Sequence, residues 1–241
     1  MRVSLFATCL VDQFWPSAGA AAVEVLRRAG CEVEFEPRQT CCGQPAFNSG
    51  YRGEARRVAR HLIEVYDGSD CDAVVIPSGS CAAMFRHLPE LFEEADPWHE
   101  RARALAGRSH ELSAFLVREL DAPELGARFE GRVSWHDACH GLRDLGLRDE
   151  PRRLIAGVAG AELVEMEGAE SCCGFGGTFS VKYPEISVAI LDRKLEELGD
   201  GTVDAVVSGD VSCLMQIGGR LARRGSPIRT LHLAELLASR A

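Results

Sequence analysis

The chain has 241 residues, of which 46% are hydrophobic, so it can bury one large core or two smaller ones. Its net charge of -9 argues against nucleic-acid binding, which normally needs a basic face. No stretch approaches the ~18 apolar residues of a membrane span, and the first residues read as a strand rather than an export signal. We therefore expect a cytoplasmic protein.

Apolar periodicity predicts strands that alternate with helices. The first part has the order strand, helix, strand, helix, strand, at residues 3–7, 17–29, 31–35, 51–66 and 73–76. The later part repeats this order, at residues 132–136, 150–159, 162–165, 184–198 and 203–207. Such alternation is typical of parallel sheets. The sequence thus predicts an α/β fold of two repeats, each a small parallel sheet with flanking helices.

The expected division of the chain follows from this repetition. It consists of a first repeat, a charged and partly helical linker, and a second repeat, at residues 1–92, 93–131 and 132–241. The best helix of the linker is expected at 111–120, and a helix at 230–239 closes the chain.

Eight of the ten cysteines recur with the same spacing in the two repeats. They stand in the order single, double, single: Cys9, Cys41, Cys42 and Cys81, then Cys139, Cys172, Cys173 and Cys213. The double cysteine follows after 31 residues in one repeat and 32 in the other, and the last cysteine after a further 38 and 39. Cys31 and Cys71 have no counterpart, and we interpret them as small buried hydrophobic residues.

Each of these cysteines falls just beyond a predicted strand, where parallel sheets bind their ligands. A glycine follows each double cysteine, at Gly43 and Gly174, and its freedom to adopt positive φ lets two adjacent thiols face one centre. Thiols stay reduced in the cytoplasm, so metal or redox chemistry is favoured over disulfides. Four thiolates suit a cubane iron–sulfur cluster or a tetrahedral zinc ion, and zinc in one repeat stays open.

Two histidines flank a cysteine of the second repeat. His136 and His140 stand on either side of Cys139 and are candidates for hydrogen bonds to cluster sulfur or for direct ligation. We favour the hydrogen bonds. Arg143 follows and is a candidate for holding an anionic substrate or a partner carboxylate, although a solvated charge is the simpler interpretation.

Five segments together resemble the cysteine-rich domain known as CCG: residues 4–12, 41–51, 136–140, 172–177 and 212–219. This domain occurs twice in one of the subunits of heterodisulfide reductase and in the iron–sulfur subunit of glycolate oxidase. The whole chain is most similar to a small lactate-utilization branch of this family, built almost entirely of two such domains. The resemblance implies two CCG repeats that hold iron–sulfur clusters.

The same resemblance implies a function. The chain would transfer electrons as a subunit of a complex that oxidises L-lactate, or a related 2-hydroxyacid, to the keto acid. Its implied partners are a ferredoxin-like iron–sulfur subunit and a third small subunit. A zinc-stabilised adaptor and a heterodisulfide-type thiol–disulfide reductase subunit are the alternatives.

One departure from the family pattern bears on the cluster type. The heterodisulfide-reductase version ends each unit in Cys-x-x-Cys and uses five cysteines for a non-cubane cluster. Here Ser78 and Asp210 replace the first cysteine of that pair. Four cysteines per repeat fit a [4Fe-4S] cubane better, with Ser78 and Asp210 beside the clusters, although Asp210 remains a candidate ligand. The loss counts against the reductase alternative.

Overall fold

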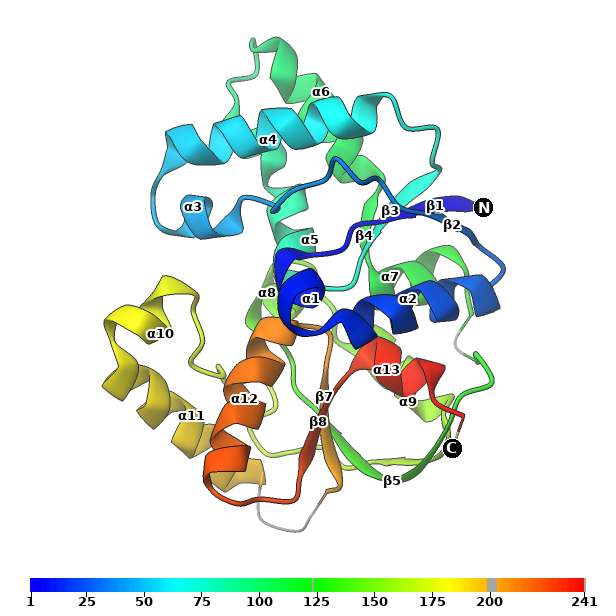
Figure 1. Ribbon diagram of the computed structural model, residues 1–241, viewed down its shortest axis with the longest axis vertical. Helices are drawn as coiled ribbons and strands as arrows, with labels where there is room; N and C mark the ends of the chain where they lie inside the picture. Colours follow the sequence, from blue (N-terminus) through cyan, green and yellow to red (C-terminus); the bar gives the residue numbers. More distant parts are fainter. Residues whose placement is uncertain (123, 199–202, 241) are drawn as a thin grey trace.

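The computed structural model describes residues 1–122, 124–198 and 203–240 as two four-stranded sheets flanked by helices (Figure 1). The strand order is β2-β1-β3-β4 in the first sheet and β6-β5-β7-β8 in the second, and every strand pair is parallel. The matched strand order confirms the predicted α/β fold of two repeats.

The first sheet and its helices occupy the N-terminal half of the chain. Its strands are β1 (Arg2–Leu5), β2 (Glu32–Glu34), β3 (Ala73–Ile76) and β4 (Ser109–Glu111). Its α-helices are α1 (Cys9–Phe14), α2 (Pro16–Arg28), α3 (Gln44–Asn48), α4 (Arg52–Asp67), α5 (Gly79–Arg86), α6 (Pro97–Gly107) and α7 (Leu112–Ala114). A 3₁₀ turn, η1, follows α5, and π-helical turns, η2, follow α7: Leu88–Leu91 and Phe115–Glu119.

The second sheet repeats the arrangement. Its strands are β5 (Arg128–Trp135), β6 (Ala159–Leu163), β7 (Ala205–Ser208) and β8 (Arg229–His232). Its helices are α8 (Cys139–Arg143), α9 (Asp149–Ala156), α10 (Thr178–Lys182), α11 (Pro184–Leu198), α12 (Val211–Arg223) and α13 (Leu233–Ala238).

Two differences from the predicted elements concern the fourth strand of each sheet. Residues Ser109–Glu111, which fall in the expected linker, pair with β3 and complete the first sheet. The helix expected at 230–239 begins only at Leu233, because Arg229–His232 pair with β7. Among the described residues, no helix is both long and apolar enough to cross a membrane.

The two sheets share one inner core. Alternate strand residues such as Val3, Leu5 and Val133 point into an apolar cluster that also contains residues of α2, α9 and α13. The opposite face of the first sheet packs against α4 and α5, and that of the second against α11 and α12, in separate clusters. Each fully buried Leu, Ile or Val side chain stabilises the fold by roughly 1.5–3 kcal/mol. The repeats are therefore halves of one packed body.

Polar contacts reinforce this junction. Helix α13 crosses back to lie beside α2 (Figure 1). The Glu235 carboxylate accepts hydrogen bonds from Trp15 Nε1 at 3.0 Å and from Ser17 Oγ at 2.6 Å. Arg28 donates to the backbone carbonyls of Leu237 and Ala238. The end of the chain is thereby fixed on the first repeat.

Candidate metal centres

Cysteines of both repeats lie at the carboxyl ends of the strands, where helices begin. Cys9 and Cys139 are the first residues of α1 and α8. Cys81 and Cys213 lie in the first turns of α5 and α12. Unpaired backbone N–H groups at a helix N-terminus stabilise a thiolate. The sequence predicted loops at these places, and the structure adds the helix starts.

The double cysteines sit in glycine turns. Gly43 and Gly174 have φ of 90° and 82°, a conformation that strongly favours glycine. The Gly43 N–H lies 3.5 Å from Cys41 Sγ, and the Gly174 N–H lies 3.3 Å from Cys172 Sγ. At Gly174 a Cβ would lie 2.4 Å from the carbonyl oxygen of Ser187, so a side chain there has no room. The turns have the geometry that the sequence predicted.

The first site consists of Cys9, Cys41, Cys42 and Cys81, which the structure brings together. The Sγ atoms of Cys42 and Cys81 are 3.3 Å apart, and both residues are buried. Cys41 contacts both Cys42 and Cys9, and these two thiols hold the pKa of Cys41 well below its usual range. The contact with Cys41 raises the pKa of Cys9. Pairwise contacts therefore connect all four thiols.

The second site consists of Cys139, Cys172, Cys173 and Cys213. The Sγ atoms of Cys173 and Cys213 are 3.1 Å apart. The contact with Cys173 raises the pKa of Cys172. Burial, and then the charge of Cys172, raises the pKa of Cys139. Contacts therefore link Cys172, Cys173 and Cys213, and Cys139 lies near enough to be affected by the charge of Cys172. Cys172 is exposed and Cys139 is half-buried.

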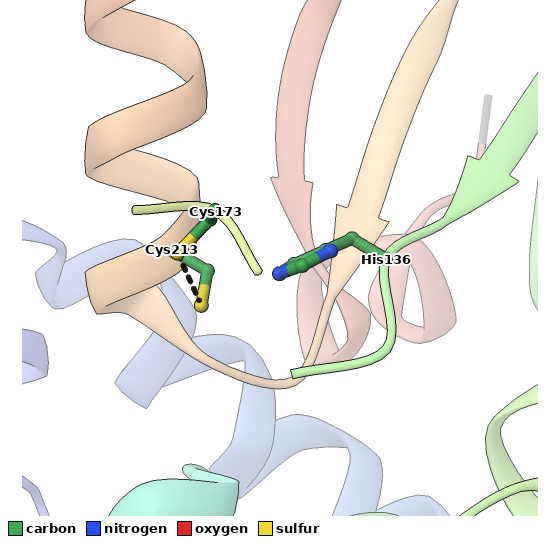
Figure 2. Close-up of side chains that lie close together, drawn as sticks. All are labelled: His136, Cys173 and Cys213. Carbon is green, nitrogen blue, oxygen red and sulfur yellow. Dashed lines mark hydrogen bonds between the residues drawn. The ribbon is translucent and has the colours of Figure 1, made fainter. Parts of the chain in front are cut away.

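His136 adds an imidazole to the second site. A ring nitrogen lies within 4.8 Å of the Sγ atoms of both Cys173 and Cys213, and the ring points toward them (Figure 2). Both ring nitrogens are buried, and neither meets a partner in good hydrogen-bond geometry among the described residues, although the Ala169 backbone lies close enough to raise the pKa of the ring. Burial, and then the charge of Lys194, lowers the pKa of His136 well below its usual value. The ring is therefore neutral, with an unused nitrogen for a bound group.

Lys194 is a buried cation beside the second site, on α11. Its Nζ donates to the carbonyl oxygens of Gly168, Ala169 and Ser171 at 3.1–3.2 Å. Burial lowers the pKa of Lys194, while the thiols of Cys173 and Cys213 are among the groups that raise it. This residue was not among those predicted from the sequence. The sequence contained one indication of it, because this lysine falls on the apolar face of the helix predicted at 184–198.

Asp210 joins the helices that carry Cys81 and Cys213. It is the N-cap of α12, where its Oδ1 accepts from Ser212 N at 3.3 Å and from Ser212 Oγ at 2.6 Å. Its Oδ2 accepts from Ser80 N, in the first turn of α5, at 2.8 Å. Ser78 caps α5 itself and lies 3.5 Å from Asp210 Oδ2. Both residues are thus buried between the two sites, as helix caps.

Glu111, at the end of β4, is a second buried carboxyl group at this junction. Its Oε2 accepts from the backbone N–H groups of Ser113 and Ala114 and from the Ser113 hydroxyl. Burial raises its pKa to about 7, and the charge of Asp210 acts in the same direction. Glu111 lines a cavity of about 20 Å³ between the repeats, enough for about one water molecule. This cavity is too small for a hydroxyacid.

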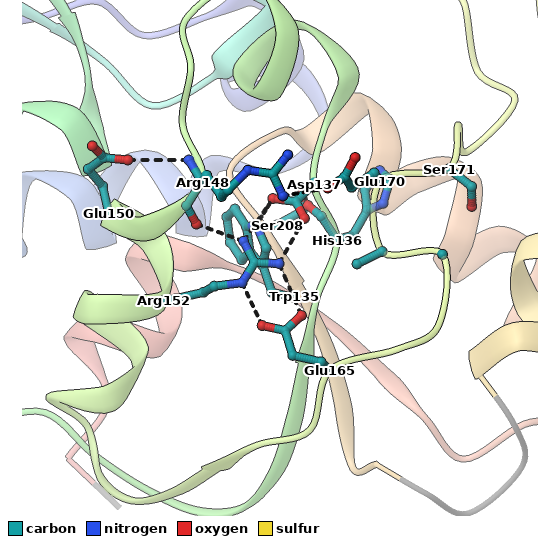
Figure 3. Close-up of polar contacts among 12 residues, drawn as sticks. Trp135, His136, Asp137, Arg148, Glu150, Arg152, Glu165, Glu170, Ser171 and Ser208 are labelled. Carbon is teal, nitrogen blue, oxygen red and sulfur yellow. Dashed lines mark hydrogen bonds and ion pairs between the residues drawn. The ribbon is translucent and has the colours of Figure 1, made fainter.

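An ion-pair network holds the segment that carries His136. The Asp137 carboxylate has no exposed surface and accepts two hydrogen bonds from the Arg152 guanidinium, at 3.1 and 2.8 Å (Figure 3). Trp135 Nε1 donates to the same carboxylate at 2.7 Å. Arg152 also pairs with Glu165. Because α9 supplies Arg152, the position of His136 depends on packing outside the cysteine turns.

His140 and Arg143 lie on α8 nearer the surface. His140 Nδ1 lies 2.6 Å from Asp144 Oδ2, so this nitrogen is used within the helix. Arg143 is exposed, and its charge opposes the rise in the pKa of Cys139 that burial causes. Arg143 therefore brings a cation close to the second site.

The donor chemistry of both sites suits a soft metal or an iron–sulfur group. All ten cysteines are free thiols. Cys31 and Cys71 are buried, as predicted. Cys31 lies in the inner core, and Cys71 lies just before β3, with its Sγ 3.8 Å from the Arg108 guanidinium. Each site offers four thiols, and the second adds a buried neutral imidazole without a partner. Thiolate and imidazole are ligands of iron–sulfur clusters and of zinc.

Comparison with known proteins agrees with this arrangement. The family described as "CCG: Cysteine-rich domain" matches residues 3–86 and 133–218, one match per repeat. Proteins called "Lactate utilization protein A" match along the whole chain. Those of Geobacillus sp. (strain WCH70) and Bacillus subtilis (strain 168) are 48% and 45% identical over 240 residues, which cover 100% of both chains in each pair. That of Exiguobacterium sp. is 45% identical over 236 residues, which cover 98% of this chain and 96% of the relative.

Proposed function

Because the chain belongs to the CCG cysteine-rich domain family, with full-length relatives named for lactate utilization, we propose that it carries electrons in lactate utilization. In this role it holds two [4Fe-4S] clusters and works in the oxidation of L-lactate, or a related 2-hydroxyacid, to the keto acid.

The observation that carries the proposal is the presence of two four-thiol sites joined through one buried carboxylate. Asp210 is hydrogen-bonded to the helix of Cys213 and to that of Cys81. Oxidation of a 2-hydroxyacid to its keto acid releases two electrons and two protons. A [4Fe-4S] cluster exchanges one electron, so two sites in one chain match the reaction.

The residues of the chain have distinct tasks in this proposal. The cysteines bind the iron atoms, and the helix N-termini together with the N–H groups of Gly43 and Gly174 lie beside the sulfur atoms. Such N–H groups stabilise added negative charge and raise a reduction potential. Asp210 keeps the two helices together, which favours electron exchange between the sites.

We also propose that the chain works with partners. A ferredoxin-like iron–sulfur protein would accept the electrons, and a third small subunit would complete the complex. Cys9 and Cys172 are exposed, so each site has one edge at the surface. A surface edge permits electron transfer to a docked protein.

A structural zinc ion is the second candidate for the second site. The observation in its favour is His136, because imidazole and thiolate together form a common zinc ligand set. Zinc there would leave one redox site in the first repeat and make the second repeat a structural element.

The test is a count of iron, acid-labile sulfide and zinc in anaerobically purified protein, with electron paramagnetic resonance (EPR) spectra before and after reduction. We expect about eight iron and about eight sulfide ions per chain, as two [4Fe-4S] clusters require. Cys81→Ser and Cys213→Ser should each remove half of the iron. The matched control, Cys71→Ser, changes a buried thiol outside both sites and should keep all of it.

Lactate oxidation is tested with the chain reconstituted with its partner subunits. Activity should fall with Cys42→Ser or Cys173→Ser and persist with the control. Zinc without sulfide, or full activity in the cysteine variants, would refute electron transfer.

A further inference from the structure

The backbone shows which residues of the two sites are equivalent. Phe6 N donates to the carbonyl of Val75 in β3, and His136 N donates to that of Val207 in β7. Both residues therefore occupy the same position after the first strand of their repeat. The register also pairs Leu5 with Val75 and Trp135 with Val207. His136 is the counterpart of Phe6.

The long helices α4 and α11 match in the same way. The first-turn hydrogen bonds Ala55 N to Tyr51 O and Ser187 N to Tyr183 O start the two helices at equivalent tyrosines. Counting eleven residues along each helix from its tyrosine makes Leu62 the counterpart of Lys194.

The different residues at these equivalent positions give the two sites different surroundings. Phe6 and Leu62 are fully buried in the apolar cluster that contains Cys42 and Cys81, so the first site has an uncharged lining at both positions. At the second site the same positions carry an imidazole and an ammonium group. Apolar lining disfavours added negative charge, whereas a cation and an N–H donor stabilise it.

The hydrogen bonds of Lys194 favour its charged form. Three carbonyl oxygens surround Nζ at 3.1–3.2 Å and accept from it, and Ser171 Oγ lies 3.3 Å away. An ammonium group has three protons to donate, whereas a neutral amine has two and would direct a lone pair at a carbonyl. The ring of acceptors therefore favours a positive charge on Lys194, beside Cys173 and Cys213.

Other charges near the second site are Arg143, Asp210, Asp137 and Glu197. Asp137 is neutralised by its bidentate pair with Arg152. Asp210 and Glu197 act against the cations, but the two oxygens of Asp210 are hydrogen-bonded to N–H groups of α5 and α12. Glu197 is paired with Arg193 at 3.8 Å. Arg143 adds to the effect of Lys194. Cations and donors thus prevail at the second site.

We propose that the second site has the higher reduction potential of the two and holds the electron when the chain carries only one. This inference rests on the proposed function, since it requires a cluster at each site. One electron leaves the reduced first site and enters the oxidised second site, with no bond made or broken. His136 and Lys194 are positioning residues in this step, because they act through the cluster surroundings.

The test converts the lining of the second site into that of the first. His136→Phe and Lys194→Leu introduce the residues found at the equivalent positions. Lys194→Met, which keeps the length of the side chain, serves if the leucine variant does not fold. Lys182→Leu removes an exposed lysine of the same repeat and is the matched charge control. Redox titration followed by EPR measures each site, with Cys81→Ser and Cys213→Ser assigning the signals.

In the unchanged protein, the second-site signal should appear first on reduction. Each lining variant should lower the ratio of reduced to oxidised second site about tenfold at fixed potential, a shift of ~59 mV. The first site and the Lys182 control should not change. Equal reduction potentials at the two sites, or a second-site potential that neither variant changes, would overturn the inference. Either result would leave the proposed electron transfer intact. Protein without iron and sulfide would overturn both.

Discussion

Asp210→Ala tests whether one carboxylate stabilises the junction of the two repeats. The substitution removes the N-cap of α12, which typically costs about 0.5–2 kcal/mol. It also removes the charged acceptor of Ser80 N, and a hydrogen bond to a charged group contributes about 1.5–3 kcal/mol. We therefore expect a loss of about 2–5 kcal/mol in the free energy of unfolding.

The measurement is urea denaturation of the reduced, metal-free chain, so that metal binding does not contribute. The midpoint should fall while the slope stays constant, as expected when stability changes without a change in the exposed surface. Asp96→Ala is the matched control, because Asp96 caps α6 through one hydrogen bond, to Trp98 N at 3.0 Å. That variant should lose about 1 kcal/mol.

Asp210→Asn separates charge from shape. An amide keeps one oxygen, which can still accept from Ser80 N, while its NH2 group can donate to Ser212 Oγ. The asparagine variant should therefore lie between the parent and the alanine variant. If Asp210→Ala costs no more than Asp96→Ala, the junction does not depend on this carboxylate and our reasoning is wrong.

Three further predictions concern other buried groups. Burial raises the pKa of Glu111 from 4.5 to about 7, so its contribution of about 3 kcal/mol is complete below pH 4.5 and lost as the pH rises through 7. Glu111→Gln should remove that loss from urea midpoints measured between pH 4 and 8, and an unchanged profile would contradict the assignment. Arg152→Met leaves Asp137 buried and unpaired, and thermal melts should show a loss of about 3–5 kcal/mol; a loss below 1 kcal/mol would mean that the pair is not needed. Gly174→Ala should abolish iron binding at the second site, because its Cβ would lie 2.4 Å from the backbone oxygen of Ser187. Gly43→Ala should keep most of the iron of the first site, because the nearest atom to its Cβ belongs to the Val58 side chain, at 3.3 Å. Equal loss of iron in the two variants would argue against this reasoning.

The elements with strong patterns were predictable from the sequence. The helix expected at 184–198 coincides with α11, and the strand expected at 73–76 coincides with β3. The helix has a clear apolar period, and the strand is a short continuous apolar run. The fourth strand of each sheet was missed, because Ser109–Glu111 and Arg229–His232 are short, largely polar edge strands with little of the alternation that identifies a strand.

The candidate sites were predictable to the level of the cysteines. Their repeated spacing grouped four residues per site, and the structure links the four thiols of the first site and three of the second, with Cys139 near the charge of Cys172. The helix starts at Cys9 and Cys139 were not predictable, since α1 and α8 have only six and five residues. Lys194 was also missed, because its role depends on three carbonyl groups of a turn more than twenty residues away in the sequence.

The periodicity of the sequence did not predict the junction between the repeats. A duplicated pattern predicts two similar units, but it does not indicate whether each unit has a core of its own. Here the inner faces of both sheets, with α2 and α13, form a single apolar cluster, so either half alone would expose that face. A large exposed apolar face is unfavourable in water. The two sites are therefore held at a fixed separation by the same burial that folds the chain, and different linings at equivalent positions can give them different properties without separate domains.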